Sequence, residues 1–165
     1  MEISFGIYPD EELKKTIDNL RFQYDRTLIK EKYPYIQFLG PVQSFANMKK
    51  VGSFFSSLLK GKKRFKLTTD IVEIEENEQI VFLNIFHKGE MQELYQILLE
   101  ELEIDESSTF YMPHIALAKN HNSDELYQIY EELKGKKIQY SFFSHYFCLY
   151  EKSSRHWEEY LVVEM

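Results

Sequence analysis

Cysteine is almost absent from this sequence: Cys148 is the single cysteine in 165 residues. One thiol cannot form an internal disulfide, which is typical of proteins in a reducing compartment, so we expect a cytoplasmic location. Cys148 lies in the apolar run HYFCLY, and we interpret it as a small buried side chain rather than a nucleophile.

Long apolar runs are also missing. No stretch approaches the ~20 apolar residues that a helix needs to span a bilayer. The opening residues, MEISFGIYPD, show no basic region followed by an apolar one, so we expect no signal peptide and no membrane partner.

Glycine and the usual metal-binding patterns are scarce. The six glycines stand singly, so there is no glycine-rich loop of the kind that cradles the phosphates of a nucleoside triphosphate. The histidines, the cysteine and the carboxylates nowhere show the spacing of a zinc site. We therefore expect no metal and no cofactor.

Acidic residues are missing from one long segment, although the net charge is −7. Between Lys32 and Thr69 there is no Asp or Glu, whereas seven basic residues lie there: Lys49, Lys50, Lys60, Lys62, Lys63, Arg64 and Lys66. This pattern indicates either a solvated basic helix end and loop or a local patch that attracts phosphate. The overall acidity argues against a general electrostatic grip on nucleic acid.

What is abundant is apolar and aromatic material, with 44% hydrophobic residues, 12 Tyr and 13 Phe. A chain of this length and composition can bury a sizeable core, so we expect one folded domain over residues 1–165. Apolar periodicity and turn residues predict strands and helices that interleave along the chain, together with two β-hairpins. Strands are expected at 3–8, 33–39 and 110–118, helices near 13–24, 48–59, 91–102 and 123–133, and hairpins over 64–87 and 138–164.

Two of the predicted strands carry almost the same five residues. PYIQF runs from Pro34 to Phe38 and PHIAL from Pro113 to Leu117. Each copy lies on a strand that leads through a turn into a helix, which indicates two similar lobes that face each other. Because hairpins occur beside the interleaved helices, the sheets should be antiparallel or mixed, and the fold class α+β.

At this point the sequence resembles the two-histidine (2H) phosphoesterase superfamily, which includes 2′-5′ RNA ligase-like proteins and cyclic phosphodiesterases. The resemblance covers nearly the whole chain: ISFGIYPD before a helix, YPYIQFLGPV, MPHIALA and the closing hairpin. It implies two pseudo-symmetric lobes of antiparallel sheet, backed by helices, around a central cleft. It also implies that each lobe places one His-x-Thr/Ser strand in that cleft.

The chemistry of that family needs two proton-transfer groups and two groups that hold phosphate. Imidazole can act as acid or base near neutral pH because its unperturbed pKa is ~6.5. A hydroxyl two residues after each histidine lies on the same face of the strand and can stabilise phosphate charge. The corresponding positions here are Tyr35, Gln37, His114 and Ala116, so only His114 matches the pattern.

We predict site residues from this correspondence. His114 is the candidate base and Tyr35 the candidate acid, while Gln37 and Ala116 are expected to contact a ligand. Lys119 follows the second motif and is expected at the mouth of the cleft. Tyr8 and Tyr111 lie on strands from which an aromatic ring could stack on a base.

Three functions stay open for the sequence. The first is a phosphodiesterase of weak or altered activity, because losing a positioned acid or base costs ~10²–10⁴ in rate. The second is a module that binds a nucleotide or an RNA end without turnover. The third is a protein-interaction or structural module that has lost the ligand cleft.

Overall fold

The computed structural model describes residues 2–87, 89–104 and 113–165. Within these ranges the elements are, in chain order, β1 (Glu2–Ile7), α1 (Glu11–Tyr24), α2 (Arg26–Lys30), β2 (Ile36–Gln43), α3 (Met48–Leu59), β3 (Lys66–Glu75), β4 (Ile80–Phe86), α4 (Glu90–Glu101), β5 (His114–Lys119), α5 (Ser123–Leu133), β6 (Ser141–Phe143), β7 (Tyr146–Ser153) and β8 (His156–Glu164).

All eight strands lie in one curled sheet with the order β6-β3-β4-β5-β2-β1-β7-β8. Each neighbouring pair is antiparallel. The units β1-α1-β2 and β4-α4-β5 occupy corresponding places on the two sides of the β5/β2 junction. The α+β fold with two pseudo-symmetric halves is therefore confirmed.

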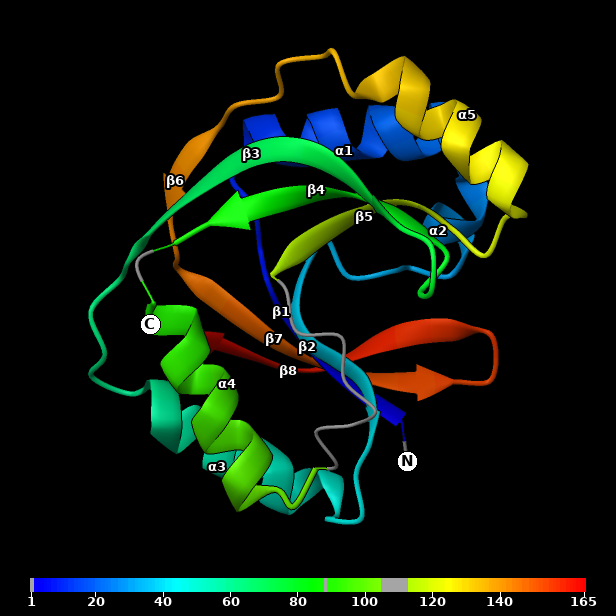
Figure 1. Ribbon diagram of the computed structural model, residues 1–165. Coiled ribbons are helices and arrows are strands. Elements are labelled where there is room, and N and C mark those ends of the chain that lie inside the picture. Colours follow the sequence, from blue (N-terminus) through cyan, green and yellow to red (C-terminus); the bar gives the residue numbers. More distant parts are fainter. Residues whose placement is uncertain (1, 88, 105–112) are drawn as a thin grey trace.

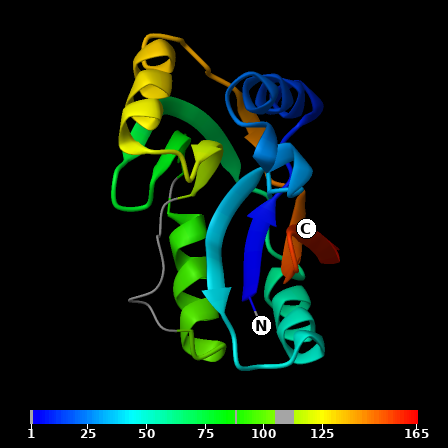
Figure 2. The same cartoon turned by 90° about the vertical axis from the view of Figure 1, so that its right-hand side faces the viewer.

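The helices form two groups at opposite ends of the molecule (Figures 1 and 2). In the first group, α1 and α2 contact β5, and α5 contacts β3, β4 and β5. In the second, α3 contacts β8 and α4 contacts β2. None of the helices in the described ranges is long and apolar enough to cross a membrane.

The two faces of the sheet bury different side chains, because successive residues of a strand point to opposite faces. One face packs Phe5, Phe38 and Phe147 into the larger apolar cluster, together with apolar residues of the helices. The other, here called the inner face, carries a smaller cluster. Its members are Leu28, Tyr33, Ile80, Phe82, Ala116, Cys148, Tyr150 and Trp157.

Most of the predicted elements are present, and two of the helices begin at a residue whose side chain caps the first turn. Asp10 accepts a hydrogen bond from the Leu13 N–H at 2.8 Å, and Asn122 accepts one from Glu125 at 2.9 Å. The short helix α2 was not predicted. Residues 110–112 of the predicted strand lie outside the described residues.

Two strand boundaries differ from the prediction. β2 was expected to stop at Gly40-Pro41, but it continues to Gln43. It can do so because Gly40 and Pro41 lie at a register shift where two residues of β2 face Ser4 of β1, and a bulge is a position in a sheet that tolerates proline. Part of the last predicted hairpin instead forms β6, which pairs with β3.

Candidate functional site

The two motif strands meet at the centre of the sheet. β2 and β5 are registered at Gln37 and His114, and alternate residues of a strand share a face. The register therefore assigns Gln37, His114 and Ala116 to the same side of the sheet, whereas Tyr35 lies at a bend just before β2. The sequence repeat thus marks the junction between the two halves.

Gln37 is buried at this junction, with an exposed fraction of 1%. The Tyr33 hydroxyl donates a hydrogen bond to Gln37 Oε1 at 2.8 Å, and Gln37 Nε2 donates one to Ser4 Oγ at 2.8 Å. Lys119 Nζ donates in turn to the Tyr33 hydroxyl at 3.0 Å. The amide predicted to hold phosphate is thus part of a side-chain network that extends from β5 to β1.

His114 and Ala116 are buried as well, with exposed fractions of 3% and 1%. The His114 ring meets the Phe82 ring nearly edge to face, with 5.6 Å between centroids. Neither residue lines the two pockets described below. A histidine in this position is enclosed by protein, and its role as a base stays a prediction.

Arg21 fills the space where the two motif strands separate. Its guanidinium donates hydrogen bonds to three carbonyl oxygens, of Ala116 at 2.9 Å, Tyr33 at 3.0 Å and Pro34 at 2.9 Å. Burial lowers the pKa of Arg21 to about 10, so the side chain is still charged at neutral pH. A single side chain of α1 thus ties β5 to the segment that precedes β2.

Tyr35 lies beside this guanidinium, with 5.5 Å between Arg21 Cζ and the ring centroid. Its hydroxyl donates a hydrogen bond to Asp18 Oδ1 at 2.8 Å. Burial and the Asp18 carboxylate raise the pKa of Tyr35 to about 12. A phenol with a raised pKa is a weaker acid than free tyrosine, which argues against Tyr35 as the proton donor in a hydrolytic reaction.

A pocket of ≈ 600 Å³ opens beside Tyr35. Five aromatic side chains line it: Tyr8, Tyr33, Tyr35, Tyr150 and Trp157. We call it the aromatic pocket. Pockets of roughly 300–1,000 Å³ with aromatic walls are the usual size and composition for small-molecule sites.

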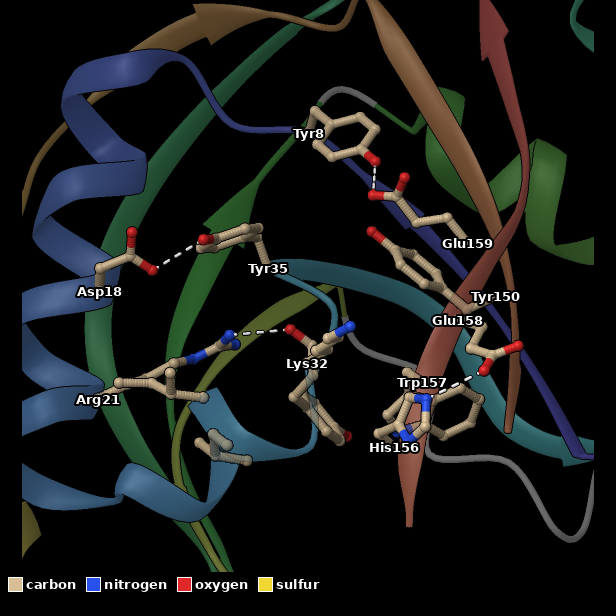
Figure 3. A pocket seen from close by; sticks show the side chains of 13 residues that line it. Tyr8, Asp18, Arg21, Lys32, Tyr35, Tyr150, His156, Trp157, Glu158 and Glu159 are labelled. Carbon is tan, nitrogen blue, oxygen red and sulfur yellow. Dashed lines mark hydrogen bonds and ion pairs between the residues drawn. The ribbon is translucent and has the colours of Figure 1, made fainter. Parts of the chain in front are cut away.

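The charged residues of the aromatic pocket are distributed unevenly (Figure 3). Arg21 and Asp18 lie on the α1 side, whereas Glu158 and Glu159 come from β8. The Tyr8 hydroxyl donates a hydrogen bond to the Glu159 carboxylate, and His156 Nε2 lies 3.0 Å from Glu158 Oε1. The β8 side therefore combines aromatic rings with negative charge.

Trp157 separates the aromatic pocket from a second pocket of ≈ 390 Å³, and it lines both. It is 2% exposed, and its indole Nε1 has no hydrogen-bond partner among the described residues. Its ring lies 6.4 Å from the Tyr33 ring at an angle of 90°. The indole N–H is thus a buried donor without an acceptor, on a residue that lines both pockets.

The second pocket contains Lys119, Asp25 and His121. The buried Asp25 carboxylate accepts a hydrogen bond from the Lys119 backbone N–H at 2.9 Å, and His121 Nε2 lies 3.2 Å from Asp25 Oδ2. Within the described ranges no group of three or more His, Cys, Asp or Glu side chains has an arrangement that could hold a metal ion.

Burial raises the pKa of the Cys148 thiol to about 12.

The predicted site residues thus fall in three places. Tyr8 and Tyr35 line the aromatic pocket and Lys119 lines the second pocket. Gln37, His114 and Ala116 are buried at the sheet junction. Tyr111 lies outside the described residues.

Sequence reasoning missed Arg21, Tyr150 and Trp157. One of them left a signal, because Arg21 interrupts the apolar stripe of α1 four residues after Ile17. A charged residue on the buried side of a helix indicates a specific partner. Nothing in the local sequence distinguishes Tyr150 or Trp157 from ordinary strand aromatics.

Several solved structures have a fold similar to that of this chain. No protein-family model and no curated protein matches the sequence. Among solved structures, LigT from E. coli in complex with ATP aligns over 99% of this chain and 98% of LigT, with a TM-score of 0.65 and 13% identity. A crystal structure of a phosphoesterase covers 99% and 98% of the two chains, with a TM-score of 0.64 and 15% identity.

A third similar structure is TT0787 of Thermus thermophilus, with a TM-score of 0.62, 12% identity and coverage of 99% and 97%. Identities this low show a shared fold and leave the activity open. The chain therefore shares the fold of LigT and of that phosphoesterase.

Proposed function

We propose that this chain binds a nucleoside or the terminal base of a nucleotide in the aromatic pocket and does not hydrolyse phosphodiester bonds. The observation that carries the proposal is the pocket itself, in which Tyr8, Tyr150 and Trp157 come together beside the motif strands. Aromatic rings bind bases of any sequence by stacking. LigT, which has the same fold, has been crystallised with 3′-AMP, ATP and NADP+.

The absence of turnover follows from the residues at the sheet junction. Tyr35, Gln37 and Ala116 replace a histidine and two hydroxyls in the resemblance stated above, and Gln37 is held by Tyr33 and Ser4. Losing one acid or base costs ~10²–10⁴ in rate, and losing one charge-stabilising donor costs ~10²–10³. Even with incomplete additivity, the remaining rate falls near background.

No hydrolysis of a cyclic phosphodiester is expected from this chain. We expect wild type and His114→Ala to open 2′,3′-cyclic AMP at the same rate as buffer, measured by chromatography of the products. Circular dichroism checks that the variant is folded, and His145→Ala serves as a matched exposed-histidine control. A wild-type rate above background that disappears in His114→Ala alone contradicts the absence of turnover.

Binding of a nucleoside or nucleotide in the aromatic pocket can be followed by fluorescence. Trp157 is the one tryptophan of the chain, so its fluorescence reports directly on the pocket wall during titration with adenosine or 3′-AMP. We expect saturable binding that Tyr8→Ala weakens by about 5- to 100-fold, because the loss of one stacking ring costs ~1–3 kcal/mol. Tyr8→Phe keeps the ring and should stay within about threefold of wild type.

The control for this titration is Tyr127→Ala, which removes a 54% exposed ring on α5. It should bind as wild type does. An unchanged fluorescence signal with both ligands, confirmed by calorimetry, would overturn the binding proposal.

A further inference from the structure

We infer that the ligand of the aromatic pocket carries a delocalised positive charge on its ring, as an N-methylated base does. This inference rests on the proposed function, because it names the chemical class of ligand for the same pocket. It concerns the β8 side of the pocket, where Glu158, Glu159, Tyr8, Tyr150 and Trp157 meet.

The carboxylates provide the first argument. Glu159 accepts a hydrogen bond from the Tyr8 hydroxyl, and Asp18 accepts one from the Tyr35 hydroxyl. A phenol hydroxyl leaves the negative charge of its partner uncompensated. Among the described residues neither carboxylate forms an ion pair with a lysine or arginine, and Glu158 has only His156 as an ion-pair partner.

Neither cation of the pocket forms an ion pair with Glu158 or Glu159 among the described residues. Arg21 lies on the opposite wall of the pocket, where its guanidinium donates hydrogen bonds to three backbone carbonyl oxygens. Lys32 is exposed and forms no ion pair among the described residues. A phosphate group placed near Glu158 and Glu159 would therefore meet two carboxylates, whereas a cationic ring would be attracted to both.

The aromatic rings provide the second argument. The face of a tryptophan or tyrosine ring attracts a cation within ~6 Å of its centroid. The outer side of the Trp157 ring already shows this preference, with Lys152 Nζ 5.1 Å from the centroid. Tyr8 and Tyr150 offer the same surface inside the pocket, next to Glu159.

The unused Trp157 Nε1 provides the third, independent argument. A buried N–H without an acceptor costs free energy, and a carbonyl oxygen or ring nitrogen of a ligand recovers it if the indole turns toward the pocket on binding. A methylated heterocycle combines a cationic ring with such an acceptor. Simple inorganic cations have no acceptor atom and fit this wall less well.

Isothermal titration calorimetry tests the inference with two matched pairs of ligands. 1-Methyladenosine is cationic at neutral pH, and adenosine is its neutral counterpart; 1-methylnicotinamide and nicotinamide form the same pair without a ribose. We expect each cation to bind about 3- to 30-fold more tightly than its neutral partner, the range that a cation–aromatic contact supports. Glu159→Gln should bring the members of each pair to within about twofold, whereas Glu76→Gln, in the exposed β3–β4 turn, should leave the preference intact.

The outcomes separate the two proposals. If adenosine binds as tightly as 1-methyladenosine, the charge inference is wrong and nucleoside binding stands. If 1-methylnicotinamide binds and neither nucleoside does, the charge inference stands and the nucleoside proposal is wrong. If none of the four ligands binds, both are wrong.

Discussion

Replacing Arg21 with methionine is expected to lower the free energy of unfolding by about 4 kcal/mol, which corresponds to a drop in Tm of roughly 8–16 °C for a domain of this size. The guanidinium donates to the carbonyl oxygens of Ala116, Tyr33 and Pro34. Methionine fills much of the space but leaves these oxygens without that donor, and each such loss costs ~1–3 kcal/mol. The release of a buried charge offsets part of this cost.

Two further variants make the Arg21 experiment specific. Arg21→Lys keeps the positive charge but loses the planar guanidinium group, whose N–H donors point in fixed directions. Its stability in urea denaturation should therefore fall between those of wild type and Arg21→Met. Arg26→Met, at an exposed position five residues later, should change stability by less than about 0.5 kcal/mol. Equal urea midpoints for Arg21→Met and wild type would show that the three carbonyl contacts are dispensable.

Adding one methyl group at Gly6 is expected to cost about 3 kcal/mol. Gly6 lies in β1 between Gln37 of β2 and Cys148 of β7. A Cβ at this position would lie 2.6 Å from the Ile36 carbonyl oxygen and 3.1 Å from Tyr150 Cε2. The oxygen belongs to a neighbouring central strand, which cannot move without disturbing the sheet junction, so the clash cannot be relieved cheaply.

The Gly6→Ala variant has a matched control within the same chain. Gly135 follows α5, and a Cβ built there meets no atom within 4 Å. Gly135→Ala should therefore be neutral or slightly stabilising, by up to about 1 kcal/mol, because alanine reduces the freedom of the unfolded chain. Thermal unfolding followed by circular dichroism compares the pair, and a Gly6→Ala protein as stable as Gly135→Ala contradicts the close approach of β1 and β2.

The sequence predicted the elements of the fold where local signals agree with tertiary structure. Asp10 and Asn122 mark helix starts because their side chains accept the free backbone N–H groups of the first turn. The end of β2 was misjudged because Gly40-Pro41 reads as a turn in isolation. Its place in a bulge depends on the pairing of β2 with β1, which no local pattern reveals.

The site was harder to predict than the fold. The repeat of PYIQF and PHIAL located the sheet junction, because its two copies pair there at Gln37 and His114. It did not reveal that Gln37 is enclosed by Tyr33 and Ser4, since these side chains come from the segment before β2 and from β1. The pocket walls that carry the proposed function come from Tyr150, Trp157 and Glu159 at the far end of the chain, and only the folded sheet brings them to Tyr8.

The junction between the halves also determines how the molecule carries mechanical load. In the described ranges β2 and β5 share one registered pair, at Gln37 and His114, whereas β7 and β8 are registered along most of their length. A pulling force that separates the halves is therefore borne by that pair, by the Arg21 contacts beside it, and by the packing of α1 on β5 and of α4 on β2. The helices thus supplement the short strand pairing, because each of these two packs on a motif strand of the opposite half.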